Sequence, residues 1–284
     1  MMPTHPPTHP PTHGRLPADA CASRPPPGLR YGEGMKPALH AAPASTRHDR
    51  LDALRGVAIV WMAAFHFMFD LAHLRFIAAD FYRDPFWTVQ RTCIVSLFLF
   101  CAGFGQAVAF EQRQSWPRFW RRWLQLAGCA LLVSAGSALM FPQSWISFGV
   151  LHGIALMLLV CRATAGWGRW LWPLGLLAIA LPSLIAHPFF DTRLTNWVGL
   201  VTRKPVTEDY VPLLPWLGVM WWGLAAGRWV SVQRPAWLAG ALAWPLAPLA
   251  ALGRWSLSFY MLHQPVLLGL LLAWRTFANA AAAA

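Results

Sequence analysis

Eight apolar runs follow one another along the chain, and each is close to the length that crosses a lipid bilayer. A helix needs about 20 residues to cross roughly 30 Å of hydrocarbon, where only helices and closed barrels satisfy their own backbone groups. The pattern therefore predicts an all-α protein, a polytopic transmembrane helix bundle of about eight spans. The runs cover residues 56–74, 92–110, 124–141, 146–161, 170–187, 211–227, 235–252 and 255–274. The seventh is the weakest, because Pro235, Pro245 and Pro248 interrupt it.

Composition agrees with a membrane protein, since 57% of the residues are hydrophobic, 12% are charged and 18 are tryptophan. The formal net charge of +12 would suggest nucleic-acid binding in a soluble protein. Here the basic residues gather at the ends of the apolar runs, where membrane topology explains them, so no nucleic-acid partner is expected. The five cysteines show no metal-ligand spacing, and no metal is expected either.

Three regions follow from these patterns. Residues 1–48 form a Pro/His-rich tail that begins MMPTHPPTHPPTHG and should be disordered, because it has too few apolar residues to bury a core. Met35 is an alternative start, so the first 34 residues remain open as part of the native chain. Residues 49–276 form the membrane domain, and residues 277–284 form an Ala-rich tail that is also expected to be disordered.

The distribution of lysine and arginine predicts the orientation. With eight spans and the N-terminus in the cytoplasm, 16 basic residues fall on the cytoplasmic side and seven on the other. Positive residues favour the cytoplasmic side of membrane proteins. The bias therefore predicts a multi-pass protein with both termini in the cytoplasm.

Two ionisable residues lie deep in the first run, which reads DALRGVAIVWMAAFHFMFDL from Asp52 to Leu71. His66 and Asp70 are four residues apart and share one face of a helix, near the middle of the span. Ionisable side chains are costly within membranes and usually face a bundle interior or a wet cavity. Because a nearby carboxylate makes a histidine more basic, His66 and Asp70 are the candidate catalytic pair. A hydrogen-bonded core histidine is the alternative.

Other polar residues from distant parts of the sequence lie at the ends or in the outer halves of predicted spans. Residues of these types at one depth can converge on a buried site. We expect them to bind substrate, although anchoring at the membrane surface explains several of them equally well. They are Arg91, His152, Asp209 and His263, and Arg55 at the start of the first run joins them because it shares the helix face of His66.

Five stretches resemble one family. LDALRGVAIVWMAAFHF and GRWSLSFYMLHQP are similar to two helices of the transmembrane acyltransferase superfamily. FLFCAGFG, FGVLHGIAL and DYVPLLPWLGVMWWGLAAGR resemble bacterial proteins related to the heparan-alpha-glucosaminide N-acetyltransferase catalytic domain. Together they cover most of residues 51–274, which would make residues 49–276 an acyltransferase-like domain of a bacterial inner (plasma) membrane protein.

The resemblance implies transfer of an acetyl or other short acyl group from cytoplasmic acetyl-CoA or another acyl-CoA to a sugar amine or hydroxyl, with His66 as general base. The acceptor would be a glycan or a small molecule. Three arginines near the start of the third run carry charge suited to the phosphates of CoA, although positive-inside anchoring explains them equally well. They are Arg118, Arg121 and Arg122. The eukaryotic heparan enzymes place their histidine after the first helix, so heparan is not implied as the acceptor.

Two other classes of protein remain open on the residues alone. His66 and His263 are candidate axial ligands of a b-type haem, or parts of a quinone site, in a redox protein. His66 and Asp70 are also a candidate proton relay in a transporter. Membrane lipids are expected partners in every case, and a homodimer is left open.

Overall fold

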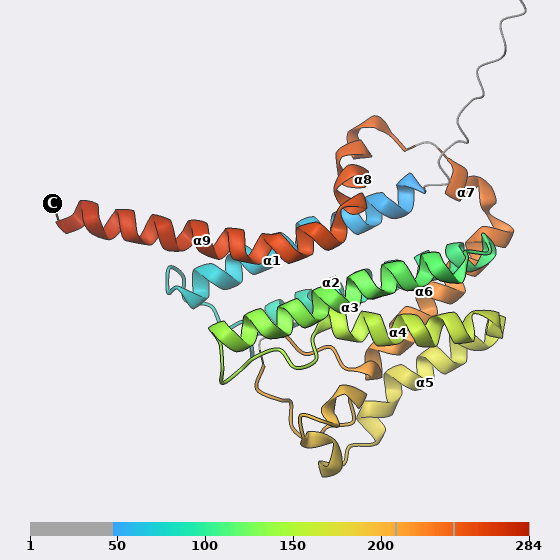
Figure 1. The fold of residues 1–284 in the computed structure, drawn as a ribbon, viewed down its shortest axis with the longest axis horizontal. Helices are drawn as coiled ribbons and strands as arrows, with labels where there is room; N and C mark the ends of the chain where they lie inside the picture. Colours follow the sequence, from blue (N-terminus) through green and yellow to red (C-terminus); the bar gives the residue numbers. More distant parts are fainter. Residues whose placement is uncertain (1–47, 208, 241, 284) are drawn as a thin grey trace, which may run out of the picture. The chain divides into compact units, whose positions relative to one another are not determined.

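The computed structural model describes residues 48–207, 209–240 and 242–283. All regular elements within these ranges are helical, which confirms the predicted all-α class for this part of the chain. The longest helices are α1 (Asp49–His73), α2 (Pro85–Glu111), α3 (Trp116–Met140) and α9 (Ser256–Ala283), shown in Figure 1. The expectation of disorder for the N-terminal tail falls on residues outside the described ranges, apart from His48.

The Ala-rich C-terminal tail is helical as far as it is described. The helix α9 continues through Ala283, where residues 277–284 were expected to be disordered. Alanine has the highest intrinsic helix propensity, so a run of alanines extends a helix that has already formed.

Three helices of intermediate length lie between α3 and the last part of the chain: α4 (Val150–Thr164), α5 (Leu171–Leu184) and α6 (Leu213–Gln233). The 3-10 helix η1 (Ala165–Trp170) joins α4 to α5 and breaks their path at Gly168, whose φ of 58° and ψ of −126° are not helical. Two further 3-10 helices, η2 (Pro188–Asp191) and η3 (Asn196–Val198), lie in the connection from α5 to α6.

Five stretches of the described residues are long and apolar enough to cross a membrane: Asp49–His73, Pro85–Glu111, Trp116–Met140, Val150–Leu184 and Ser256–Ala281. The fourth stretch contains both α4 and α5. These stretches support a membrane protein with several spans. They do not confirm eight, because α4 and α5 have 15 and 14 residues and are about 22 Å long at a rise of 1.5 Å per residue.

The seventh apolar run is not a span. It is divided into α7 (Pro235–Ala239), the 3-10 helix η4 (Trp244–Leu246) and α8 (Ala247–Arg254). A proline stands in the first turn of each, because proline is tolerated at a helix start and disrupts a helix interior. The α8 helix packs closely on α1, where a side chain at Gly56 would collide with the backbone of Leu249.

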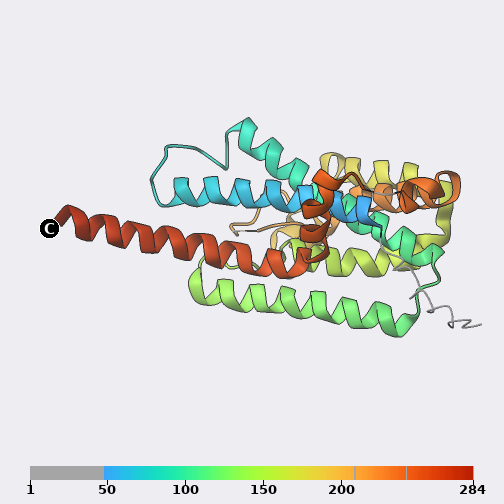
Figure 2. The ribbon, with the colours of Figure 1, turned by 90° about the horizontal axis from the view of Figure 1, so that it is seen from above.

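The helices α1 and α9 run parallel and lie side by side (Figures 1 and 2). Arg254, just before α9, contacts Asp49 at the start of α1, and Gln264 contacts Asp70 near the end of α1. The C-terminal end of α9 therefore lies at the opposite end of α1 from Asp49. Because the seventh run does not cross, the described ends of α1 and α9 lie at opposite ends of this helix pair, and the placement of both termini in the cytoplasm stays a prediction.

Close backbone contact between α2 and α6 forms much of the core. A side chain at Gly103 would collide with the carbonyl of Met220, and one at Gly223 with the carbonyl of Phe100. Small residues permit this approach between membrane helices. By contrast, only 6% of the apolar window in α3, and of that in α9, is buried within the protein, which leaves both helices with wide lipid-compatible faces.

Candidate active site

Two histidines meet between α1 and α9. The ring centroids of His66 and His263 are 5.0 Å apart, and the rings cross at 82° in an edge-to-face arrangement. The sequence predicted both residues as site residues, and the parallel packing of the two helices brings them together at one depth. A haem cannot lie between rings in direct contact, so this pair does not fit the haem form of the redox alternative.

The carboxyl group of Asp70 is held by Gln264 of α9. The Gln264 side-chain amide donates to Asp70 Oδ1 at 2.6 Å, and Asp70 is only 2% exposed. Asp70 Oδ2 and Gln264 Oε1 are also buried and have no hydrogen-bond partner among the described residues. The sequence predicted Asp70 as the carboxylate partner of His66, and the structure pairs it with Gln264 instead. Gln264 also interacts with the His66 ring, so it links the two predicted catalytic residues.

The backbone fixes the tautomer of a neutral His263. Its Nδ1–H donates to the carbonyl of Tyr260 at 2.8 Å, because a carbonyl oxygen can only accept. The lone pair of the neutral ring then lies on Nε2, which is buried and has no partner among the described residues. A buried lone pair without a donor is costly, and it is suited to accepting a proton from a bound molecule.

Tyr260 connects the histidine pair with a second polar group around Asp209. The Tyr260 ring lies 5.8 Å from that of His263, and its phenol interacts electrostatically with Asp209. Asp209 Oδ2 accepts from the backbone N–H of Val150 at 2.6 Å, at the start of α4. Loss of hydration raises the pKa of Asp209 to about 6, although this hydrogen bond and the nearby charges of Arg91 and Lys204 oppose the shift.

His152 is fully hydrogen-bonded, unlike His263. Its Nδ1 accepts from the backbone N–H of Gly149 at 3.3 Å, and its Nε2–H donates to the hydroxyl of Ser134 at 3.2 Å. The Ser134 hydroxyl in turn donates to the carbonyl of Ile146. These contacts hold the His152 ring against the segment that leads into α4, where Val150 contacts Asp209, and its role in binding substrate stays a prediction.

Arg55 does not join the histidine pair. It lies 11 residues before His66, or about 16 Å along the helix axis, and pairs with Asp52 at 2.9 Å. Arg254 completes this group through Asp49 at 2.7 Å. Arg254 lies at the end of α8, and these contacts bring it to the N-terminal end of α1.

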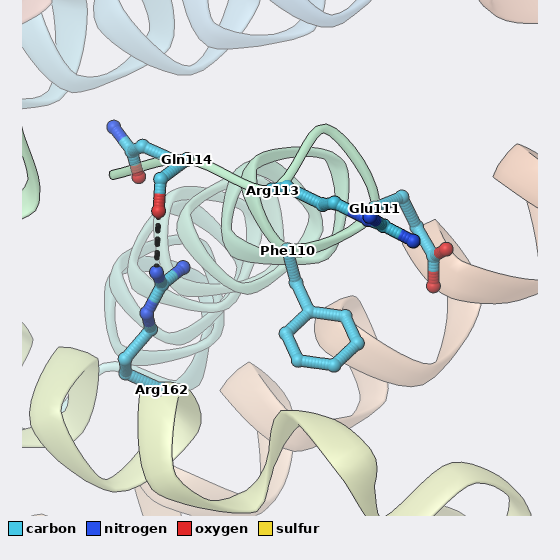
Figure 3. Close-up of a pocket in the computed structure, with 5 residues that line it drawn as sticks. All are labelled: Phe110, Glu111, Arg113, Gln114 and Arg162. Atoms are coloured by element: carbon cyan, nitrogen blue, oxygen red, sulfur yellow. Dashed lines mark hydrogen bonds between the residues drawn. The ribbon is translucent and has the colours of Figure 1, made fainter. Parts of the chain in front are cut away.

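The three predicted CoA-binding arginines are exposed on one helix. Arg118, Arg121 and Arg122 lie on α3 and make no hydrogen bond or ion pair with the rest of the described chain. A cavity of about 450 Å³ lies beside this region and is lined by two other arginines, Arg113 and Arg162 (Figure 3). For metals, the described residues bring no three His, Cys, Asp or Glu side chains together as a possible ligand set.

A family model for the heparan-alpha-glucosaminide N-acetyltransferase catalytic domain matches residues 47–265. The chain belongs to this family. The matched region includes both histidines, Asp70, Gln264 and Asp209, so the whole group described above lies within the family domain. No curated protein and no solved structure matches the chain.

Proposed function

We propose that this protein is an integral membrane acyltransferase. It moves an acetyl or other short acyl group from a cytoplasmic acyl-CoA to a sugar amine or hydroxyl on the other side of the membrane. Family membership supports the reaction class. The observation that carries the proposal is the contact between His66 and His263, together with a nitrogen of His263 and an oxygen of Asp70 that have no hydrogen-bond partner among the described residues.

The reaction needs one base and a route for one proton. An imidazole takes the proton from the acceptor hydroxyl or amine, whose oxygen or nitrogen attacks the thioester carbonyl carbon and forms a tetrahedral oxyanion. The carbon–sulfur bond then breaks, and the imidazolium returns the proton to the thiolate of CoA. His66 is the proposed base, and Asp70 and Gln264 orient it. His263 contacts the same ring and is able to share the proton.

The proposed orientation follows the charge bias at the N-terminal end of α1, which we assign to the cytoplasm. Because α9 runs parallel to α1, the same orientation puts the C-terminal end of α9 on the outer side. His66 lies ten residues beyond Gly56, about 15 Å along the axis and near the membrane centre. A base at this depth lies about midway between a donor on one side and an acceptor on the other. The proposed location is a bacterial inner membrane.

The test uses the purified full-length protein in detergent with acetyl-CoA, with and without glucosamine as acceptor, and measures release of the free CoA thiol. Wild-type protein should release thiol faster when the acceptor is present. His66→Gln should lower this rate by about 10²- to 10⁴-fold, the usual contribution of a general base. His73→Gln, near the exposed end of the same helix, is the matched control and should retain activity. Full activity in His66→Gln would remove the proposed mechanism.

A further inference from the structure

The cavity at the end of α2 has features of a binding site. It is lined by Phe110, Glu111, Arg113, Gln114 and Arg162 and has a volume of about 450 Å³. Gln112, next to this lining, hydrogen-bonds His48 just before α1 at 3.0 Å. The cavity is therefore at the N-terminal end of α1, the end with the Arg55 and Arg254 ion pairs, and well separated from the histidine pair.

The guanidinium of Arg162 contacts three residues, and one of its nitrogen donors makes no hydrogen bond with the described residues. Its Nη2–H donates to the carbonyl of Gln114 at 2.7 Å, as Figure 3 shows, and its guanidinium lies 4.9 Å from the Trp116 ring and 5.5 Å from the Phe119 ring. Its Nη1 is buried and has no partner among the described residues. A buried charged donor without a partner suggests an ion or a ligand, and the planar guanidinium matches the geometry of a phosphate group.

Arg113 adds a second positive charge in an unusual backbone conformation. Its φ of 49° lies in the left-handed region, where a helix end normally takes glycine. The backbone N–H of Arg113 donates to the carbonyl of Phe110, and that of Gln114 donates to the carbonyl of Ala109. This conformation therefore ends α2 and satisfies two of its last carbonyl groups. This conformation fixes where the Arg113 side chain leaves the backbone at the edge of the cavity.

The acidic residue of the lining does not cancel these charges. Glu111 Oε1 accepts from Arg228 Nε at 3.1 Å, which neutralises its charge with an arginine that lies outside the lining. The two lining arginines therefore leave a net positive charge at the cavity.

We propose that this cavity binds a phosphate group through Arg162 Nη1, with Arg113 as the second charge. A phosphate reaches this end of the molecule from two sources: the phosphates of CoA, or the headgroup of an anionic phospholipid. The assignment to CoA rests on the proposed function, whereas the phosphate chemistry does not.

The test compares Arg162→Gln and Arg113→Gly with the control Arg169→Gln, whose side chain is exposed in η1. Arg113→Gly removes the charge and relieves the strained backbone, so it should fold at least as well as the wild type. Binding of CoA and of inorganic pyrophosphate to each purified protein is measured by calorimetry. Both cavity variants should bind at least 10-fold more weakly than the wild type, and the control should bind normally.

The outcomes separate the two sources and the two proposals. If binding of CoA and pyrophosphate is unchanged but retention of phosphatidylglycerol in nanodiscs falls in both variants, the phosphate site stands with a lipid as its ligand. If neither changes, the site is overturned. An active wild type, with binding of CoA, pyrophosphate and phosphatidylglycerol all unchanged in both variants, would overturn the site alone. A wild type that binds pyrophosphate through these arginines but transfers no acyl group would overturn the proposed function alone.

Discussion

The two polar groups along α1 differ in how fully their hydrogen-bonding capacity is used. At its N-terminal end, Asp52 pairs with Arg55 at 2.9 Å and Asp49 pairs with Arg254 at 2.7 Å, on partly exposed side chains. Near its other end, the carboxyl of Asp70 and the Nε2 of His263 are buried with unused acceptors. Folding accounts for the first group, because its charges are paired. The second group needs a bound molecule to account for it, which is why we place the chemistry there.

The largest expected effect tests whether the two histidines act as one unit. The experiment measures the acceptor-dependent rate of CoA thiol release in three variants: His66→Gln, His263→Gln and the double variant. If the rings share one proton, the double variant should be no slower than the slower single variant, because residues that act together are strongly non-additive. Multiplied losses would mean that the two histidines work independently, and full activity in His263→Gln would leave His66 as the base without it.

The next effect concerns stability around Asp70. Gln264→Leu removes the donor to Asp70 Oδ1, so both carboxyl oxygens lack a partner in a residue that is 2% exposed. An unsatisfied buried polar group costs about 1 to 3 kcal/mol, which thermal unfolding in detergent should detect. Gln264→Glu with Asp70→Asn exchanges the two groups and is the control that should recover stability. Equal melting temperatures for Gln264→Leu and the wild type would show that this hydrogen bond does not stabilise the fold.

The sequence was sufficient to predict the all-α fold class and to show which polar residues lie within the apolar helices. Apolar run lengths predicted helices, and the cost of burying His66 and Asp70 pointed to the helix that carries the candidate site. The sequence did not predict which side chains these polar residues contact. The contact between His66 and His263 depends on α1 and α9 running parallel, and that depends on the seventh run folding back as α7 and α8. The prolines in the seventh run indicated that it could fold back, but hydropathy alone counted this run as a span.

Side-chain roles also depended on contacts that spacing does not contain. His152 and His263 look alike in the sequence, since each lies within an apolar helix. The structure gives His152 a partner on each ring nitrogen and leaves His263 with one unpaired. Gln264 stands between His263 and a proline in the sequence, and its hydrogen bond to Asp70 spans 194 residues. Such pairings follow from tertiary packing, so no local pattern predicts them.

A smaller effect on stability is expected from Asp209. Like Asp70 it is buried, and like Asp49 and Asp52 it has a partner, the backbone N–H of Val150. Its pKa is raised from 3.8 to about 6 by loss of hydration. The ionised form is therefore disfavoured in the folded state, and stability should fall as the pH rises from about 4 to about 6. Asp209→Asn keeps an acceptor for the Val150 N–H and should remove this part of the pH dependence. Melting temperatures at pH 5 and pH 7 measure it, and the same slope in both proteins would contradict the assignment.

The smallest effect on stability and activity is expected at the N-terminal end of α1, where the charged side chains are paired. Arg254 and Asp49 form an ion pair of 2.7 Å, but their side chains are 38% and 46% exposed. Water and salt screen such a pair, so it contributes about 0 to 1 kcal/mol. Arg254→Gln should therefore shift the melting temperature by no more than a few degrees and leave acyl transfer unchanged. A loss of activity comparable to that of His66→Gln, without loss of stability, would mean that the paired group also contacts a substrate. The division between a structural end and a reactive centre of α1 would then be wrong.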